Sequence, residues 1–329
     1  MNTNNLANMN FRQRFFFRLR SDTPLLFMCR VLRSLILKFE KFKKSFYANF
    51  YKLVHRDRFI MREVLGSKMY LDLVDKGLSR DLLTYGIREP LATEVMQEIL
   101  KPGQIVVEIG ANIGYYALLE AKTVGEKGKV YCLEPAPENI ELLRRNISAN
   151  GYKNIEVVHG AAGAETKESK LYLSESHNQH AMSAENVRGA VGSTPVQMFS
   201  LDDFMKDKPY PTLVRMDVEG YELDILRGMK KILATGKPLQ FFIEVHCFFL
   251  KEKVLDLIAI LRENGFRVKV GTWEITTISG GRIMRTIFDY CSNKLGVGDT
   301  GKFWPTMDEL EKRLAHEEEL SVTVFFERP

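Results

Sequence analysis

Hydrophobic and polar positions alternate along the chain with two different periods. Short apolar runs typical of buried strands are followed by stretches in which apolar residues recur every three or four positions, as on one face of a helix. The strand-like runs are QIVVEIG, KVYCLEP, IEVVHG, TLVRMDV, LQFFIEVH, FRVKVGT and LSVTVFFERP, and helical patterns at 114–124, 137–149, 221–233 and 251–263 separate most of them. This alternation predicts an α/β fold with a doubly wound, mostly parallel sheet. The last strands lack a helix between them, which favours an antiparallel edge strand.

The first part of the chain has a different pattern. Residues 1–20 are polar and then aromatic-basic, and we expect disorder there. From Pro24 onward apolar residues recur at steps of three and four, and Thr23 is a suitable cap for a helix that begins with proline. The apolar positions are Leu25, Cys29, Leu32, Ile36, Phe39, Phe42, Phe46, Phe50 and Leu53. We therefore expect a helical extension over residues 1–58.

The remainder, residues 59–329, is expected to form one domain. Its first part, 59–100, predicts a cap of two short strands around Gly66-Ser67, followed by an amphipathic helix at 90–100. A polar insertion, SESHNQHAMSAENVRGAVG at 174–192, interrupts the alternation. Long insertions in such domains are often functional, so we expect this one beside the ligand crevice.

Charge is unevenly distributed along the chain. Residues 1–58 hold 13 Lys and Arg against 3 Asp and Glu, whereas the rest holds 34 against 39. A basic arm on a mildly acidic body suggests contact with an anionic surface. Two interpretations stay open for residues 11–55: an amphipathic helix packed on the body or on a second subunit, and peripheral contact with a membrane. No base-reading motif accompanies the charge, so a nucleic-acid partner is not expected.

The cysteines and the apolar runs bear on the cellular location. The four cysteines are far apart and form no CxxC pair, which excludes a disulfide framework and a zinc pattern and favours a reducing cytoplasm. The most apolar early stretch is interrupted by Arg30 and Arg33, which argues against a spanning helix. We therefore expect a cytoplasmic protein that is soluble or peripheral to a membrane.

The turn VVEIGANIG carries the main chemical signal. Gly110 and Gly114 lack the middle glycine of a dinucleotide fingerprint, and the P-loop lysine is also absent. Glu108, which stands two residues before Gly110, would repel pyrophosphate but attract an ammonium group. Glu134 ends the next strand, where a carboxylate accepts hydrogen bonds from a ribose diol. An ammonium partner and a ribose partner together describe S-adenosylmethionine.

Four segments, EIGANIGYY, VYCLEPAPEN, RMDVEGYE and LLTYGIREP, resemble the FkbM family of S-adenosylmethionine-dependent methyltransferases. The resemblance covers roughly residues 68–245. It implies a seven-stranded class I methyltransferase sheet of Rossmann-like type and O-methylation of a sugar, glycan or polyketide hydroxyl. Glu108 stands where the family usually has Asp. The carried-over cofactor residues are Glu108, Gly110, Asn112 and Gly114 in the loop, Glu134 at the ribose, and Gly160 and Ala161 near the adenine.

The catalytic candidates lie at the ends of later strands. Asp217 ends the fourth strand and is expected beside the methyl donor, where it would contact cofactor, substrate or metal, and Glu219 follows on the substrate side. Glu244 and His246 share one face of the fifth strand. His246 is a candidate general base, because its ordinary pKa of about 6.5 suits proton removal near neutrality. A structural histidine is the alternative.

Two further assignments complete the expected site. Asp217 and Glu244 could supply oxygen ligands for Mg²⁺, although a metal-free mechanism is the other option. His177, Asn178 and His180 in the insertion are candidates for the acceptor pocket, or else a solvated loop.

The sequence thus predicts an O-methyltransferase that uses S-adenosylmethionine on a hydroxyl of a sugar, glycan or glycolipid. Three alternatives remain: carboxyl methylation of a uronic acid, N-methylation, and a non-catalytic cofactor-binding scaffold. The sequence does not fix the oligomeric state, and a homo-oligomer is one option.

Overall fold

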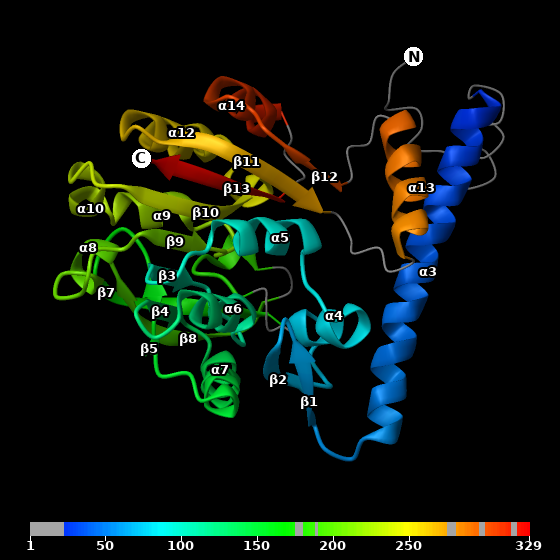
Figure 1. The fold of residues 1–329 in the computed structure, drawn as a ribbon, viewed down its shortest axis with the longest axis horizontal. Helices are drawn as coiled ribbons and strands as arrows, with labels where there is room; N and C mark the ends of the chain where they lie inside the picture. Colours follow the sequence, from blue (N-terminus) through cyan, green and yellow to red (C-terminus); the bar gives the residue numbers. More distant parts are fainter. Residues whose placement is uncertain (1–22, 175–179, 188–189, 275–280, 296–299, 317–320) are drawn as a thin grey trace.

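The computed structural model describes residues 23–174, 180–187, 190–274, 281–295, 300–316 and 321–329 (Figure 1). The disorder expected over residues 1–20 lies outside the described residues. Within them, all seven strand-like runs of the sequence form strands of one large sheet.

The large sheet has eight strands, in the order β12-β11-β13-β10-β9-β3-β4-β5. Their bounds are β3 Ile105–Ile109, β4 Lys129–Glu134, β5 Ile155–His159, β9 Leu213–Met216, β10 Leu239–His246, β11 Arg267–Glu274, β12 Thr300–Phe303 and β13 Ser321–Arg328. The five strands from β5 to β10 are mutually parallel, and β13 runs antiparallel to both of its neighbours. The α/β, mostly parallel architecture is therefore confirmed.

The eighth strand was not predicted. β12 pairs antiparallel with β11 over only four residues, with Phe303 opposite Gly271. Its sequence, TGKF, is too short to show a periodicity of its own. The sheet does end in an antiparallel edge strand from the last part of the chain, as the sequence favoured, and that strand is β12. β13 lies inside the sheet, antiparallel to β10 and β11. Helices at Gly281–Lys294 and Met307–His316 separate these last strands, where the sequence indicated none.

Helices cover both faces of this sheet and create two apolar cores. Val106 and Val107 are adjacent in β3 and point to opposite faces, so each belongs to a different core. One core involves α5 (Pro90–Ile99), α6 (Tyr115–Val124) and α7 (Pro137–Asn150), and the other involves α9 (Glu222–Arg227), α10 (Lys230–Ala234), α12 (Lys253–Glu263) and α14 (Met307–His316). The predicted helix at 221–233 is split at Gly228, where a Cβ atom would lie 2.1 Å from the carbonyl oxygen of Gly163.

Smaller elements frame one edge of the domain. β1 (Phe59–Val64) and β2 (Ser67–Asp72) form the expected hairpin, and α4 (Leu78–Tyr85) follows it. The hairpin is held to α7 by Asn146, whose Oδ1 accepts a hydrogen bond from the Tyr70 amide at 2.6 Å. A three-stranded sheet of β6 (Ala161–Ala162), β7 (Lys167–Ser174) and β8 (Ala190–Phe199) was not anticipated.

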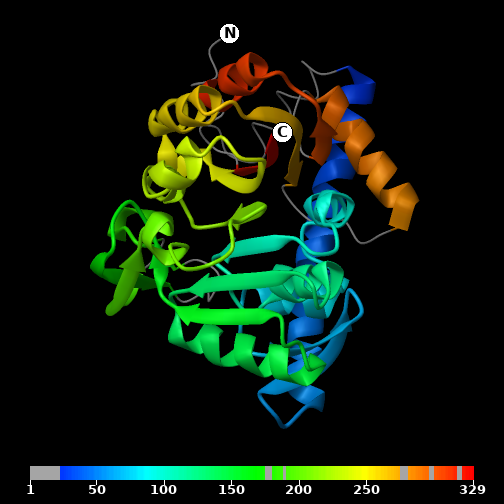
Figure 2. The same cartoon turned by 60° about the vertical axis from the view of Figure 1, so that its left-hand side comes forward.

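The N-terminal helix, α3 (Pro24–Val54), begins where the sequence indicated, and the Thr23 hydroxyl accepts a hydrogen bond from the Leu26 amide at 3.4 Å. It packs against α4 and against α13 (Gly281–Lys294), a helix that comes from the other end of the chain and lies alongside it in both views (Figures 1 and 2). No helix in the described ranges is both long enough and apolar enough to cross a membrane.

Candidate functional site

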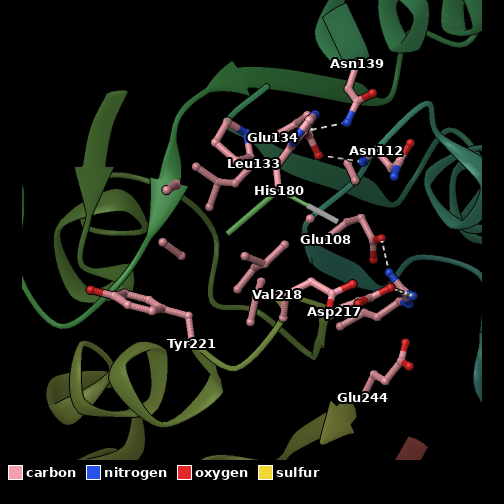
Figure 3. A pocket seen from close by; sticks show the side chains of 18 of the residues that line it. Glu108, Asn112, Leu133, Glu134, Asn139, His180, Asp217, Val218, Tyr221 and Glu244 are labelled. Atoms are coloured by element: carbon pink, nitrogen blue, oxygen red, sulfur yellow. Dashed lines mark hydrogen bonds and ion pairs between the residues drawn. The ribbon is translucent and has the colours of Figure 1, made fainter. Parts of the chain in front are cut away.

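One pocket lies where β3, β4, β9 and β10 end at their carboxyl termini (Figure 3). Ligands of open parallel sheets bind at this edge, because the strand ends and their loops leave a crevice there. Glu134 and Asn112 are at one end of the close-up view and Asp217 and Glu244 at the other. The insertion contributes His180, together with its two following residues, to the lining. The expectation that this insertion borders the crevice is therefore confirmed for its described part.

Packing within the protein requires glycine in the turn after β3. Gly110 has φ of 79°, and a Cβ atom there would lie 2.1 Å from the carbonyl oxygen of Asp217 on the neighbouring strand. Glycine is thus required for close approach of two strand ends, and not only for approach of a ligand. Gly114 caps α6 and does not line the described pocket, since its α-carbon faces Leu143.

Glu134 is tied to the same turn. Its carboxylate accepts hydrogen bonds from the backbone amide of Asn112 at 2.7 Å, from that of Ala136 at 3.0 Å and from the side-chain amide of Asn139 at 3.2 Å. Burial nevertheless raises the pKa of Glu134 to about 7, because these three donors only partly offset the loss of water. The predicted ribose-binding acid therefore faces the pocket from a fixed position.

Glu108 forms an ion pair with Arg215, which the sequence pattern did not predict. It is 1% exposed, and its Oε1 accepts a hydrogen bond from Arg215 at 2.6 Å. Arg215 also reaches Asp217 at 3.3 Å and stacks 3.8 Å from the centroid of the Tyr116 ring. The charge of Glu108 is thus paired inside the protein. A single arginine in the apolar run TLVRMDV was the available signal for this ion pair.

Four carboxylates surround His246. Its Nδ1 lies 2.7 Å from Oε1 of Glu222, and its Nε2 lies 3.6 Å from Glu219, 3.6 Å from Glu244 and 3.9 Å from Asp217. Glu222 also accepts a hydrogen bond from the Gly220 amide at 3.1 Å, so the tight turn after β9 is fixed to the histidine. Glu222 thus holds the imidazole from the first turn of α9.

This arrangement sets the protonation states. Burial alone would lower the pKa of His246, but the surrounding carboxylates, Glu244 first, raise it well above 6.5. Burial works against ionisation of Asp217 as well, yet Arg215 and His246 lower its pKa below the ordinary value. Burial raises the pKa of Glu219 to about 7 and that of Glu244 well above its ordinary value. The imidazole is therefore protonated near neutrality, and a free imidazole base does not fit this environment.

Two residues before α5 also belong to the site. Arg88 and Glu89 line the pocket, and Arg88 donates hydrogen bonds to Glu89 at 2.7 Å and to Asp81 at 2.9 Å. Glu89 has φ of 44°, and two other lining residues, Asn112 at 49° and Glu219 at 50°, share this left-handed conformation. Such strain in non-glycine residues concentrates at functional sites. The motif GIREP, noted only for its resemblance, was the signal for them.

The remaining candidate residues differ in whether the structure places them at the pocket lining. Gly160 and Ala161 line the pocket, although a Cβ atom on Gly160 would lie 2.7 Å from the Phe199 ring, which gives that glycine a packing reason too. His180 lies at the lining, and its Nδ1 accepts a hydrogen bond from the Ser174 amide at 3.0 Å. His177 and Asn178 fall outside the described residues.

One group of side chains among the described residues could hold a metal ion. Asp217, Glu219 and His246 each offer one ligand atom, and these atoms lie within 4.8 Å of one another. Glu244, the second ligand in the prediction from sequence, is not in this group and contacts His246 instead.

The sheet order and the pocket at its carboxyl edge define a class I methyltransferase fold. Residues 108–268 match the profile of the methyltransferase FkbM domain, and we identify them as a domain of that family. Residues 42–170 also match the profile of protein-L-isoaspartate(D-aspartate) O-methyltransferase. The resemblance noted from sequence is therefore confirmed.

Individual relatives cover only part of the chain. A protein-L-isoaspartate O-methyltransferase of Methanococcoides burtonii is 41% identical over 75 residues, which are 22% of this chain and 37% of that protein. Protein-L-isoaspartate O-methyltransferase 1 of Archaeoglobus fulgidus is 41% identical over 76 residues, 22% of this chain and 35% of that protein. The structure of methyltransferase FkbM from Methylobacillus flagellatus has 18% identity and a TM-score of 0.38, covering 69% of this chain and 53% of that one.

Proposed function

We propose that this protein transfers the methyl group of S-adenosylmethionine to a neutral hydroxyl, as found on a sugar, glycan or glycolipid. The observation that carries the acceptor class is the excess of acidic side chains in the pocket lining. Its lining holds six carboxyl groups against two guanidinium groups: Glu89, Glu108, Glu134, Asp217, Glu219 and Glu244 against Arg88 and Arg215. Carboxylates accept hydrogen bonds and hydroxyls donate them, so the lining suits a polyol and disfavours an anion.

The proposed cofactor position follows the strand ends. The ribose diol donates to Glu134, and the adenine lies along Gly160 and Ala161. The methionine end is a zwitterion, and the adjacent opposite charges of Arg88 and Glu89 fit its carboxylate and ammonium groups. This arrangement would place the methyl group near Asp217, at the other end of the pocket (Figure 3).

The main task of the protein is to align the acceptor oxygen with the methyl group, because the sulfonium is already reactive. The acceptor hydroxyl must lose a proton as its oxygen takes the methyl group. Among the lining acids at the Asp217 end of the pocket, Glu219, with its pKa raised to about 7, is best matched to accept that proton near neutrality. His246 does not line the pocket, and we assign it a positioning role behind Asp217, Glu219 and Glu244.

Carboxyl methylation is the main rival, since the named relatives are protein-L-isoaspartate O-methyltransferases. The match to that profile ends at residue 170, before Asp217, Glu219, Glu244 and His246. It therefore bears on the cofactor half of the pocket and not on the acceptor half. N-methylation and a non-catalytic scaffold remain outcomes of the same test.

A divalent cation is a further proposed component. Two carboxylates and an imidazole suit Mn²⁺ better than Mg²⁺, which prefers oxygen ligands. Asp217, Glu219 and the deprotonated imidazole of His246 would hold it, so binding would displace the imidazole proton. The cation would then replace Glu219 as the group that assists deprotonation, by polarising the acceptor oxygen. Electron paramagnetic resonance of free Mn²⁺ in a titration tests this, with Asp217→Asn as the variant that should lose binding.

The acceptor class is tested with methyl-labelled S-adenosylmethionine and three acceptors: a neutral oligosaccharide pool, a uronic-acid oligosaccharide and an isoaspartyl peptide. We expect base-stable label in the neutral pool, because an ether resists alkali and an ester does not. Label that alkali releases from either acidic acceptor would show carboxyl methylation. Cofactor binding without transfer to any acceptor would support the scaffold alternative.

A further inference from the structure

Helix α3 presents a long apolar stripe to solvent. Apart from Val54 at the end of the helix, its exposed large apolar side chains are Leu25, Met28, Val31, Leu32, Leu35, Phe39, Phe42, Phe46, Phe50 and Leu53. Except for the adjacent pair Val31 and Leu32, these positions advance in steps of three and four, so they stay on one side of a helix of 31 residues, roughly 46 Å long. Phe42, Phe46 and Phe50 stack on one another along it.

A different side of the helix packs on the rest of the protein. The buried residues of α3 are Cys29, Ile36 and Glu40, and they face α4 and α13. At 100° per residue these positions lie about 100° around the helix from the centre of the stripe. The docking of α3 on the body, which was one interpretation of its sequence, therefore leaves the stripe uncovered within the described part of the chain.

The charge of α3 indicates what would cover the stripe. The helix contains seven Lys and Arg and one acidic residue, Glu40, which is buried. Lys38 borders the stripe on one side, and Lys41 and Lys52 are exposed beyond it on the polar side. Lys43 borders the other side, where its ammonium group lies 5.3 Å from the centroid of the Tyr85 ring of α4. Apolar and aromatic side chains flanked by lysines are the pattern of helices that lie in the interface of an anionic membrane.

A second copy of this chain fits less well. Pairing two α3 stripes in parallel would bring Lys38 of one helix close to Lys38 of the other, and likewise Lys43, and like charges at such borders are destabilising. No exposed acidic residue of α3 is available to offset them. A net charge of +6 on one helix repels its own copy and attracts anionic headgroups.

We propose that the apolar stripe and bordering lysines of α3 bind an anionic lipid surface and hold the methyltransferase domain against it. This inference does not depend on the acceptor assigned above. It accounts for apolar side chains that are largely solvent-exposed, with Phe42 66% and Leu53 85% exposed.

The test is co-sedimentation of the full chain with vesicles of phosphatidylcholine containing 30% phosphatidylglycerol and with vesicles of phosphatidylcholine alone. We expect binding to the anionic vesicles that falls several-fold as salt rises from about 0.05 to 0.5 M, because screening weakens the lysine contacts. Neutral vesicles should bind at least tenfold less.

Two variants, each with a control, test the apolar stripe and the lysines separately. Phe42→Glu/Phe46→Glu places charges on the stripe and should lower anionic-vesicle binding at least tenfold, whereas Leu255→Glu, at an exposed leucine of α12, should not. Lys38→Glu/Lys41→Glu/Lys52→Glu should also lower binding, whereas Lys127→Glu/Lys170→Glu/Lys206→Glu, with the same total charge and exposed positions, should retain most of it. Circular dichroism and cofactor binding show that each variant is folded.

Three results would overturn the proposal. One is unchanged vesicle binding by the stripe variant, and another is equal binding to neutral and anionic vesicles. The third is a dimer by light scattering that the stripe variant converts to a monomer, which would assign the stripe to a second copy. Failure of the acceptor assay leaves all three readouts intact, so the two proposals fail separately.

Discussion

Glu134 is the residue whose role can be isolated most cleanly. It is held by three donors and lines the pocket at the end of β4. We expect Glu134→Ala to weaken binding of S-adenosylhomocysteine at least tenfold in calorimetry, since hydrogen bonds to a charged group contribute about 1.5–3 kcal/mol. The exposed Glu141→Gln on α7 is the matched control. Equal affinity of Glu134→Ala and the wild type would contradict the ribose assignment.

The raised pKa of Glu134 predicts a pH dependence with a definite sign. A carboxyl group whose pKa rises from 4.5 to about 7 on folding binds its proton more tightly in the folded state. Its contribution to the free energy of unfolding therefore falls as pH rises from about 4.5 to 7. A diol donates to the ionised form, so cofactor affinity should rise between pH 6 and 8. Calorimetry across this range should show the rise in the wild type and a flat profile in Glu134→Gln.

Glu222 is a positioning residue in this scheme. Its bond to Nδ1 of His246 fixes the ring behind the lining acids. Glu222→Gln should lower kcat about tenfold or more while cofactor affinity stays within twofold, because geometry at the acceptor end is lost. Asp224→Asn, on the same helix, should change neither. A Glu222→Gln protein with normal kcat would show that His246 is only structural.

At the scale of elements, the packing of the strand ends against one another determines the geometry of the site. Gly110 and Gly103 both have positive φ, 79° and 83°, but only Gly110 has a protein atom where a Cβ would stand. Alanine at either position incurs the backbone strain, and Gly110→Ala also incurs the clash with the carbonyl of Asp217. We expect urea denaturation to show Gly110→Ala less stable than Gly103→Ala by about 1–3 kcal/mol. Equal losses would mean that the turn can move away from β9.

The elements that were predicted share one property. Each has an apolar run or periodicity of its own: the seven predicted strands and three of the four predicted helices form as expected, and the fourth, at 221–233, is split at Gly228. The unpredicted β6, β7, β8 and β12 are short or largely polar, and although they bury single residues such as Leu171 and Val196, each forms by pairing with a neighbouring strand. Arg215 was missed because its partner Glu108 comes from a distant segment, whereas the partners of Arg88, Glu89 and Asp81, lie within seven residues of it.

At the scale of the whole molecule, α13, from the C-terminal part of the chain, packs against the N-terminal helix α3. Phe288 of α13 is fully buried, and the guanidinium group of Arg33 of α3 lies 5.5 Å from the centroid of its ring. We expect Phe288→Ala to lower the free energy of unfolding by about 3–5 kcal/mol in urea titrations, the usual loss for a buried phenylalanine. Ile287→Ala, at the adjacent exposed position, should cost well under 1 kcal/mol. Comparable losses in the two variants would argue against packing of α13 on α3.

The sequence by itself determined the class of fold, the cofactor loop and the acids at the ends of three strands, because local periodicity and turn chemistry are properties of consecutive residues. Only the tertiary structure decided how those acids are charged. Glu108 became half of an ion pair with Arg215, and His246 became a protonated group among four carboxylates. Burial and distant charges set these states, and neither can be assigned until the strands that carry them lie side by side.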